Sequence, residues 1–226
     1  MKLGARTRTP YSSYKVLTLG IRWGYSAFFE LQFTKVSDRQ VEVAILIGGG
    51  FMTADRSIQI REATTSADDE SIFALNFEYL TWATAQLFEK YGISWQVDVG
   101  EVRKMLAKFK RPDGVIFLAE VDNEPVGVVA IRTLNGGVLE IKRMYVQPAW
   151  RGAHVGSALI DCALREASAM GAVKVRLDTN RFMTDAQRLY RSRGFSERSP
   201  YEGTEIPSEF QKYWLFFEKD VMGTES

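Results

Sequence analysis

The stretch Met144–Leu159, MYVQPAWRGAHVGSAL, decides how this chain is interpreted. It runs from the end of an apolar strand, through a turn with proline and glycine, into a helix. A helix start has free backbone N–H groups and the positive end of the helix dipole, so it is a natural phosphate site. Gly152 and Gly156 would let an anion approach the backbone closely, and Arg151 adds a positive charge. The pattern predicts a site for a pyrophosphate-containing ligand; the alternative is an ordinary strand-to-helix turn with a surface arginine.

Composition excludes several classes of site. The chain has one cysteine, Cys162, which excludes an intrachain disulfide and a cysteine-cluster metal site. It also has one histidine, His154, which argues against histidine zinc sites and Ser-His triads. We therefore expect no metal.

Length and charge define the class of protein. The 226 residues, 46% hydrophobic and 25% charged, suit one soluble domain plus an appendage. With 29 basic and 28 acidic residues, nothing favours nucleic acid or a membrane surface as the main partner. No apolar run approaches the roughly 20 residues of a membrane span, and no secretion signal is evident. We expect a soluble cytoplasmic protein.

Residues 1–56 are the least informative part of the chain. They contain aromatic and β-branched runs at Tyr25–Phe33 and Val41–Ile47, and then three consecutive glycines that read as a linker. Two accounts compete: a small β-rich addition, or a disordered or mis-assigned extension upstream of a true start at Met52. The second is slightly favoured, because the recognisable pattern begins just after Met52.

A regular order of elements begins at Ser57. The periodicities and turn residues predict a strand at 57–62, a helix from about 65, a helix at 98–110, strands at 115–121, 126–132 and 138–146, a helix at 155–170, a strand at 173–177, a helix at 184–191 and a strand at 213–219. The three strands joined by short turns predict an antiparallel meander, with Gly127 at a bulge. The strand–helix–strand unit around the opening motif predicts a parallel, right-handed crossover.

Three segments in this order resemble the GNAT superfamily of acetyl-CoA-dependent N-acetyltransferases. They are the pre-loop strand KRMYVQP at 142–148, the loop RGAHVG at 151–156, similar to (Gln/Arg)-x-x-Gly-x-(Gly/Ala), and AQRLY at 186–190 followed by Gly194-Phe195, similar to A-x-x-L-Y…G-F. One glycine-rich turn is a weak signal, but three segments in order are a strong one. The resemblance covers about residues 57–221 and implies an N-acetyltransferase domain at 57–222. It implies an α/β (α+β) fold with a mixed, mostly antiparallel sheet, flanking helices and strands that splay at the cofactor site.

The resemblance implies acetyl-CoA as co-substrate, no metal, and direct attack by an amine of a small molecule or a protein. Val146 would bond the pantetheine through its backbone and polarise the acetyl carbonyl, and the N–H groups that follow would hold the pyrophosphate. The implied cofactor-binding residues are Met144, Tyr145, Val146, Arg151, Gly152, Ala153, His154, Val155, Gly156, Ser157 and Asn180. The resemblance is also compatible with a homodimer.

Two residues are the implied catalytic groups. An amine of lysine type has a pKa near 10.4, so a proton must leave before or during attack. Glu140 is the best general base, through a water; alternatively, it pairs with a nearby lysine or arginine. Tyr190 would protonate the departing thiolate; alternatively, it is a half-buried helix aromatic. Tyr201 either lines the acceptor pocket or packs in a turn.

Two positions depart from the family pattern. His154 stands where the family usually has glycine, and a positive φ there would cost on the order of 1–3 kcal/mol. Met183 stands where an asparagine often precedes A-x-x-L-Y, while Asn180 lies three residues earlier. These departures support a rival interpretation, a non-catalytic acyl-CoA-binding or regulatory module. A third possibility is the transfer of another acyl group.

Overall fold

The computed structural model describes residues 17–22, 28–37, 40–47, 50–52 and 57–221. The chain divides into two units, Met1–Ser57 and Ile58–Ser226. In the first unit, the strands form one antiparallel sheet in chain order: β1 (Leu17–Arg22), β2 (Phe28–Ser37), β3 (Gln40–Ile47) and β4 (Gly50–Met52). They lie in the stretch for which the sequence left two accounts open. Gly48 and Gly49 of the expected linker lie outside the described residues.

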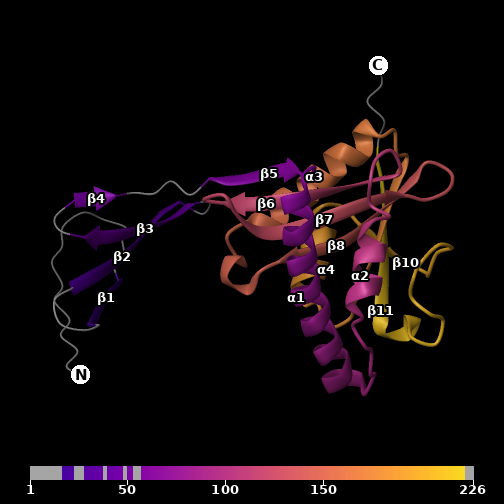
Figure 1. Ribbon diagram of the computed structural model, residues 1–226, viewed down its shortest axis with the longest axis horizontal. Helices are drawn as coiled ribbons and strands as arrows, with labels where there is room; N and C mark the ends of the chain where they lie inside the picture. The colour runs from indigo at the N-terminus through magenta and orange to yellow at the C-terminus, as the bar shows by residue number, and fades with distance from the viewer. Residues whose placement is uncertain (1–16, 23–27, 38–39, 48–49, 53–56, 222–226) are drawn as a thin grey trace. The chain divides into compact units, whose positions relative to one another are not determined.

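The second unit is built on a seven-stranded sheet in the order β10-β11-β9-β8-β7-β6-β5 (Figure 1). Its strands are β5 (Ile58–Glu62), β6 (Gly114–Val121), β7 (Glu124–Thr133), β8 (Val138–Val146), β9 (Lys174–Asn180), β10 (Ser196–Arg198) and β11 (Trp214–Asp220). Neighbouring strands are antiparallel except for the β8–β9 pair, which is parallel. The expected mixed, mostly antiparallel sheet is therefore confirmed.

Helices cover both faces of this sheet. They are α1 (Ser66–Tyr91), α2 (Val99–Leu106), α3 (Val155–Ala169) and α4 (Thr184–Ser192). Helix α1 begins at a capping box, in which Thr65 and Asp68 each accept the other's backbone N–H. Among the described residues, no helix is both long and apolar enough to cross a membrane.

Alternation along the strands separates the two faces. In β6, Val115 and Phe117 belong to the core beneath α3 and α4, whereas Ile116 and Leu118 belong to the core beneath α1 and α2. Every residue of β6 is buried, as expected for a strand covered on both sides.

A bulge in β7 helps α3 to approach the sheet. The pairing with β6 skips Val126, one residue before the expected position at Gly127. A Cβ at Gly127 would lie 3.0 Å from the Tyr145 carbonyl oxygen and 3.1 Å from Leu159 Cδ1, so glycine lets α3 and β8 pack closely here.

Strands β8 and β9 separate along their length. They pair only from Val138 to Ile141, opposite Lys174 to Leu177. A second bulge in β8 places Arg143 and Met144 opposite a single residue of β7, and Arg143 has a φ of 55°. We call the unpaired region between 142–146 of β8 and 178–180 of β9 the β8–β9 opening. It confirms the expected splay.

Candidate active site

The start of α3 lies beside the end of β8 and presents free N–H groups. The first intrahelical bond runs from the Ala158 N–H to the His154 carbonyl, 3.0 Å, so the N–H groups of residues 155–157 precede the helical ladder. No acidic residue occupies the first turn. A Cβ at Gly152, where φ is 84°, would meet no atom within 4 Å. An anion therefore has both donors and room at this helix end.

His154 adopts the left-handed conformation, with φ 64° and ψ 5°. The positive φ on which the expected strain depended is therefore present. A residue other than glycine carries strain on the order of 1–2 kcal/mol in this conformation. Its side chain does not cap α3.

Arg151 lies over the end of β8. Its Nε donates to the Val146 carbonyl oxygen at 3.2 Å, and its guanidinium lies 5.4 Å from the centre of the Trp82 ring and 5.7 Å from that of Tyr145. This charge is therefore placed between the β8–β9 opening and the start of α3.

Consecutive residues of β8 serve opposite faces. Met144 and Val146 pack on the α3 side. Tyr145 points to the α1 side, where its hydroxyl donates to Glu78 Oε1 at 2.9 Å, and burial together with Glu78 raises the pKa of Tyr145 to about 12. Among the expected cofactor residues, Tyr145 therefore offers its backbone, and not its side chain, to the α3 side.

Tyr190 of α4 lies on the α3 side of the opening. It is 6% exposed, and its hydroxyl is 3.8 Å from Met144 Sδ, a long contact to a weak acceptor. The ring packs against Phe195 and Phe217. Burial, helped by Tyr79 and Asp178, raises the pKa of Tyr190, so the hydroxyl keeps its proton at neutral pH.

Asn180 ends β9. Its Oδ1 accepts from the Tyr91 hydroxyl and the Phe182 N–H, both at 3.3 Å. Its Nδ2 is buried, and it has no hydrogen-bond partner among the described residues. An amide donor is therefore left over at this end of the opening.

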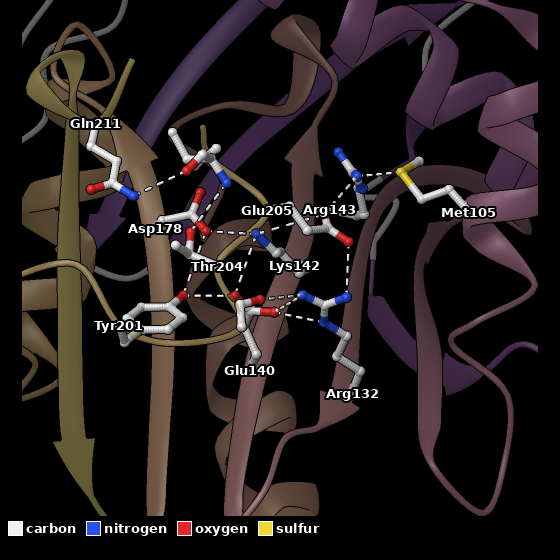
Figure 2. Close-up of polar contacts among 12 residues, drawn as sticks. Met105, Arg132, Glu140, Lys142, Arg143, Asp178, Tyr201, Thr204, Glu205 and Gln211 are labelled. Carbon is white, nitrogen blue, oxygen red and sulfur yellow. Dashed lines mark hydrogen bonds and ion pairs between the residues drawn. The ribbon is translucent and has the colours of Figure 1, made fainter. Parts of the chain in front are cut away.

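A charged cluster fills the α1 side of the sheet next to the opening (Figure 2). It consists of Arg132, Glu140, Lys142, Arg143, Asp178, Tyr201 and Glu205. Glu140 is fully buried and accepts from Arg132 Nε at 2.6 Å and from the Tyr201 hydroxyl at 2.7 Å. The ion pair that the sequence allowed for Glu140 is thus present.

Lys142 bridges the two separating strands. Its Nζ donates to Asp178 Oδ2 at 2.6 Å and lies 3.4 Å from Glu140 Oε1. Burial alone would lower the pKa of Lys142, but Asp178, Glu140 and Glu205 outweigh it and hold the pKa above its ordinary value. Lys142 is therefore charged at neutral pH.

Glu205 comes from the loop between β10 and β11. It accepts from Arg132 Nη1 at 2.8 Å. Burial would raise the pKa of Glu205, but Lys142, Arg132 and Arg143 together lower it. The loop thus adds a third carboxylate to the cluster.

Comparison with known proteins identifies the family. Residues 77–195, more than half of the chain, match the model of the acetyltransferase (GNAT) family. The chain belongs to the GNAT family. It is accordingly an acyltransferase, and the β8–β9 opening with the adjacent start of α3 is its candidate active site.

Individual relatives agree with this family. An uncharacterised N-acetyltransferase of Schizosaccharomyces pombe is 32% identical over 48% of this chain and 68% of its own length. The IAA acetyltransferase of Azospirillum brasilense is 40% identical, but the match covers only 33% of this chain and 48% of that protein. The structure of the PaiA N-acetyltransferase of Thermoplasma acidophilum, in complex with coenzyme A, matches with a TM-score of 0.56 at 19% identity, over 73% of this chain and 99% of that one.

Five members of the charged cluster in this GNAT protein were not expected from the sequence: Arg132, Lys142, Arg143, Asp178 and Glu205. Asp178 had a signal, because alternation places it on the same face of β9 as Asn180. Glu205 had none, because it lies in a loop and meets Arg132 across 73 positions of sequence. Within the described part of the chain, no three His, Cys, Asp or Glu side chains gather as a metal site would require.

Proposed function

We propose that residues 57–222 transfer an acetyl group from acetyl-CoA to a primary amine by direct attack. The observation that carries this proposal is the β8–β9 opening, which has a buried, protonated Tyr190 and the free N–H groups of α3 on one side of it. The T. acidophilum neighbour is a coenzyme A complex on the same fold. Acetyl-CoA would supply an activated thioester at this opening.

Several groups fit the co-substrate. The N–H groups from Gly152 to Ser157 and the guanidinium of Arg151 would hold the pyrophosphate. In this arrangement Arg151 exchanges the Val146 carbonyl for a phosphate, which frees the backbone of Val146 for the pantetheine arm. The unpartnered Nδ2 of Asn180 would donate to an acceptor on the same arm.

Tyr190 is the proposed general acid. Its raised pKa keeps the proton available at neutral pH, and its hydroxyl lies on the α3 side, where the departing thiolate would form. A positioned proton donor of this kind contributes roughly 10² to 10⁴ in rate.

Glu140 remains the proposed general base, acting indirectly. Because it is fully buried, it needs an intermediary to receive a proton from an amine. The Tyr201 hydroxyl donates to Glu140 at 2.7 Å and lies 3.5 Å from Asp178 Oδ2, so it links Glu140 to the Asp178 carboxylate, which is 8% exposed, at the opening. The amine proton would pass to Asp178 and along this link.

Calorimetry with CoA and thiol release from acetyl-CoA over a panel of primary amines test the proposal together. We expect CoA binding and turnover with at least one amine. Absence of CoA binding at millimolar concentration would refute the proposal. The rival is a non-catalytic acyl-CoA-binding or regulatory module; CoA binding without turnover on any amine would establish it.

A further inference from the structure

Arg143 occupies a strained position at the mouth of the opening. It is the first residue of the bulge in β8 and has a φ of 55°, a backbone conformation that residues other than glycine rarely adopt. Bulges near active sites often re-aim a side chain, and strain that persists in a fold is a reason to look for function. The bulge aims the Arg143 side chain between α2 and the β10–β11 loop, where it meets Met105 and Glu205 (Figure 2).

The Nε and Nη2 donors of Arg143 have weak hydrogen-bond partners or none among the described residues. Its Nε is buried and has no hydrogen-bond partner among the described residues. Its Nη2 contacts the thioether of Met105, a weak acceptor, and lies 3.5 Å from Glu205 Oε2. The side chain is only 14% exposed, so water supplies little compensation.

Arg132 shows what a satisfied arginine in the same cluster looks like. It donates from Nε to Glu140 at 2.6 Å, from Nη1 to Glu205 at 2.8 Å and from Nη2 to the Gly203 carbonyl at 3.2 Å. The carboxylates of the cluster are thus taken up mainly by Arg132 and Lys142. Arg143 is left with one ion pair, to Glu205 Oε2 at 3.5 Å, which is longer than the contacts that Arg132 and Lys142 make.

We infer that Arg143 binds the carboxylate of the acceptor, so that the preferred acceptor carries both a primary amine and a carboxylate, as amino acids and short peptides do. This inference rests on the proposed acetyl transfer. A guanidinium matches a carboxylate through two parallel hydrogen bonds. The buried Nε and the Nη2 of Arg143 would supply them when the acceptor takes the place of the Met105 thioether.

The charge balance of the cluster fits such an acceptor. Three cations face three carboxylates: Arg132, Lys142 and Arg143 against Glu140, Asp178 and Glu205. A zwitterion adds no net charge to this balance. Its carboxylate would meet Arg143, and its ammonium group would meet Asp178, on the side of the sheet opposite Tyr190.

Matched acceptors that differ only in the carboxylate test the inference. The pairs are phenylalanine with phenethylamine, and lysine with cadaverine. With the full-length protein, we expect kcat/KM to favour the carboxylate member by about 10- to 100-fold, the range for a hydrogen bond to a charged group. Arg143→Gln should remove most of this preference, and Arg143→Lys, which keeps the charge but loses the fork, should remove part of it.

The matched control is Arg103→Gln. Arg103 lies on α2 but pairs with the exposed Glu70, at 3.0 and 2.9 Å, so its loss should leave the preference unchanged. Binding provides a second readout: in the presence of CoA, N-acetylphenylalanine should bind more tightly than N-acetylphenethylamine, and Arg143→Lys should narrow the difference. If Arg143→Gln does not fold, Arg143→Lys carries both tests.

The failures are distinguishable. Normal CoA binding and turnover, with equal kcat/KM for both members of each pair, would overturn the inference and leave the acetyl transfer standing. A preference that survives in Arg143→Lys and Arg143→Gln would also overturn it. Absence of CoA binding would instead remove the proposed function, and the inference with it.

Discussion

The Lys142 ammonium group lies 2.6 Å from Asp178 Oδ2, at the first position where β8 and β9 no longer pair through their backbones. Both side chains are nearly buried, at 7% and 8% exposed. The ion pair thus replaces the backbone ladder at the point where the sheet opens.

Lys142→Met should lower the free energy of unfolding by about 3–5 kcal/mol, because it leaves Asp178 and Glu140 buried with less compensation. Urea unfolding at pH 7 measures this. The control is Lys104→Met, which breaks an exposed pair with Glu101 (75% and 70% exposed) and should change stability by less than about 1 kcal/mol. Equal effects of the two substitutions would contradict the structural importance of the bridge.

Tyr190→Phe should lower kcat by roughly 10² or more while the Kd for CoA changes little. The ring contacts with Phe195 and Phe217 do not depend on the hydroxyl, so the fold should be kept. Steady-state kinetics and calorimetry on the same preparation separate the two effects. Wild-type turnover in the variant would exclude Tyr190 as the acid.

His154→Gly should raise the free energy of unfolding by about 0.5–1 kcal/mol, since glycine tolerates a φ of 64° and its greater backbone entropy offsets part of the relief. His154→Val should lower it by about 1–2 kcal/mol, because a branched side chain is worse in this conformation. Denaturant unfolding checks both. A glycine variant less stable than wild type would indicate that the His154 side chain makes a stabilising contact.

Glu218 predicts a dependence of stability on pH. It accepts from Arg176 and Lys174 of β9 and from Arg198 of β10. Burial would raise the pKa of Glu218, but these hydrogen bonds lower it from its ordinary 4.5 to about 2. The unfolded chain therefore takes up this proton at a higher pH than the folded chain does. The stabilisation, at most about 3 kcal/mol, is complete above about pH 5 and is lost as the pH falls towards 2.

Glu218→Gln should therefore be less stable than wild type at pH 7 and close to it at pH 2. Urea unfolding of both proteins at the two pH values measures the difference. A gap that stays constant with pH would show that the carboxylate charge is not its source.

The fold was predictable wherever local pattern decides structure. The apolar run at 115–121 and the helical spacing of Ile72 and Leu75 predicted a strand and a helix close to those observed. Strand β9 was expected to end at Leu177, because Asp178, Thr179 and Asn180 are polar. It continues to Asn180 because these residues pair with β11, a partner far away in the sequence.

The candidate site was likewise predictable only where its residues lie in local sequence motifs. Tyr190 and the loop before α3 lie in contiguous motifs, so their positions followed from the sequence. The bulge at Arg143 did not, because a bulge is a mismatch between two strands and neither strand alone encodes it. Short β10 was also missed, since three residues at the sheet edge carry no alternation to detect.

The β8–β9 opening also gives this sheet an edge in its interior. Strand edges present unpaired N–H and C=O groups that accept an additional strand. A ligand arm that hydrogen-bonds to the backbone of Val146 would take the place of a pairing strand between β8 and β9 while it is bound. Binding would then complete the hydrogen bonding of the sheet and stabilise it locally. Amide hydrogen exchange at 142–146 and 178–180 should therefore slow when CoA is added.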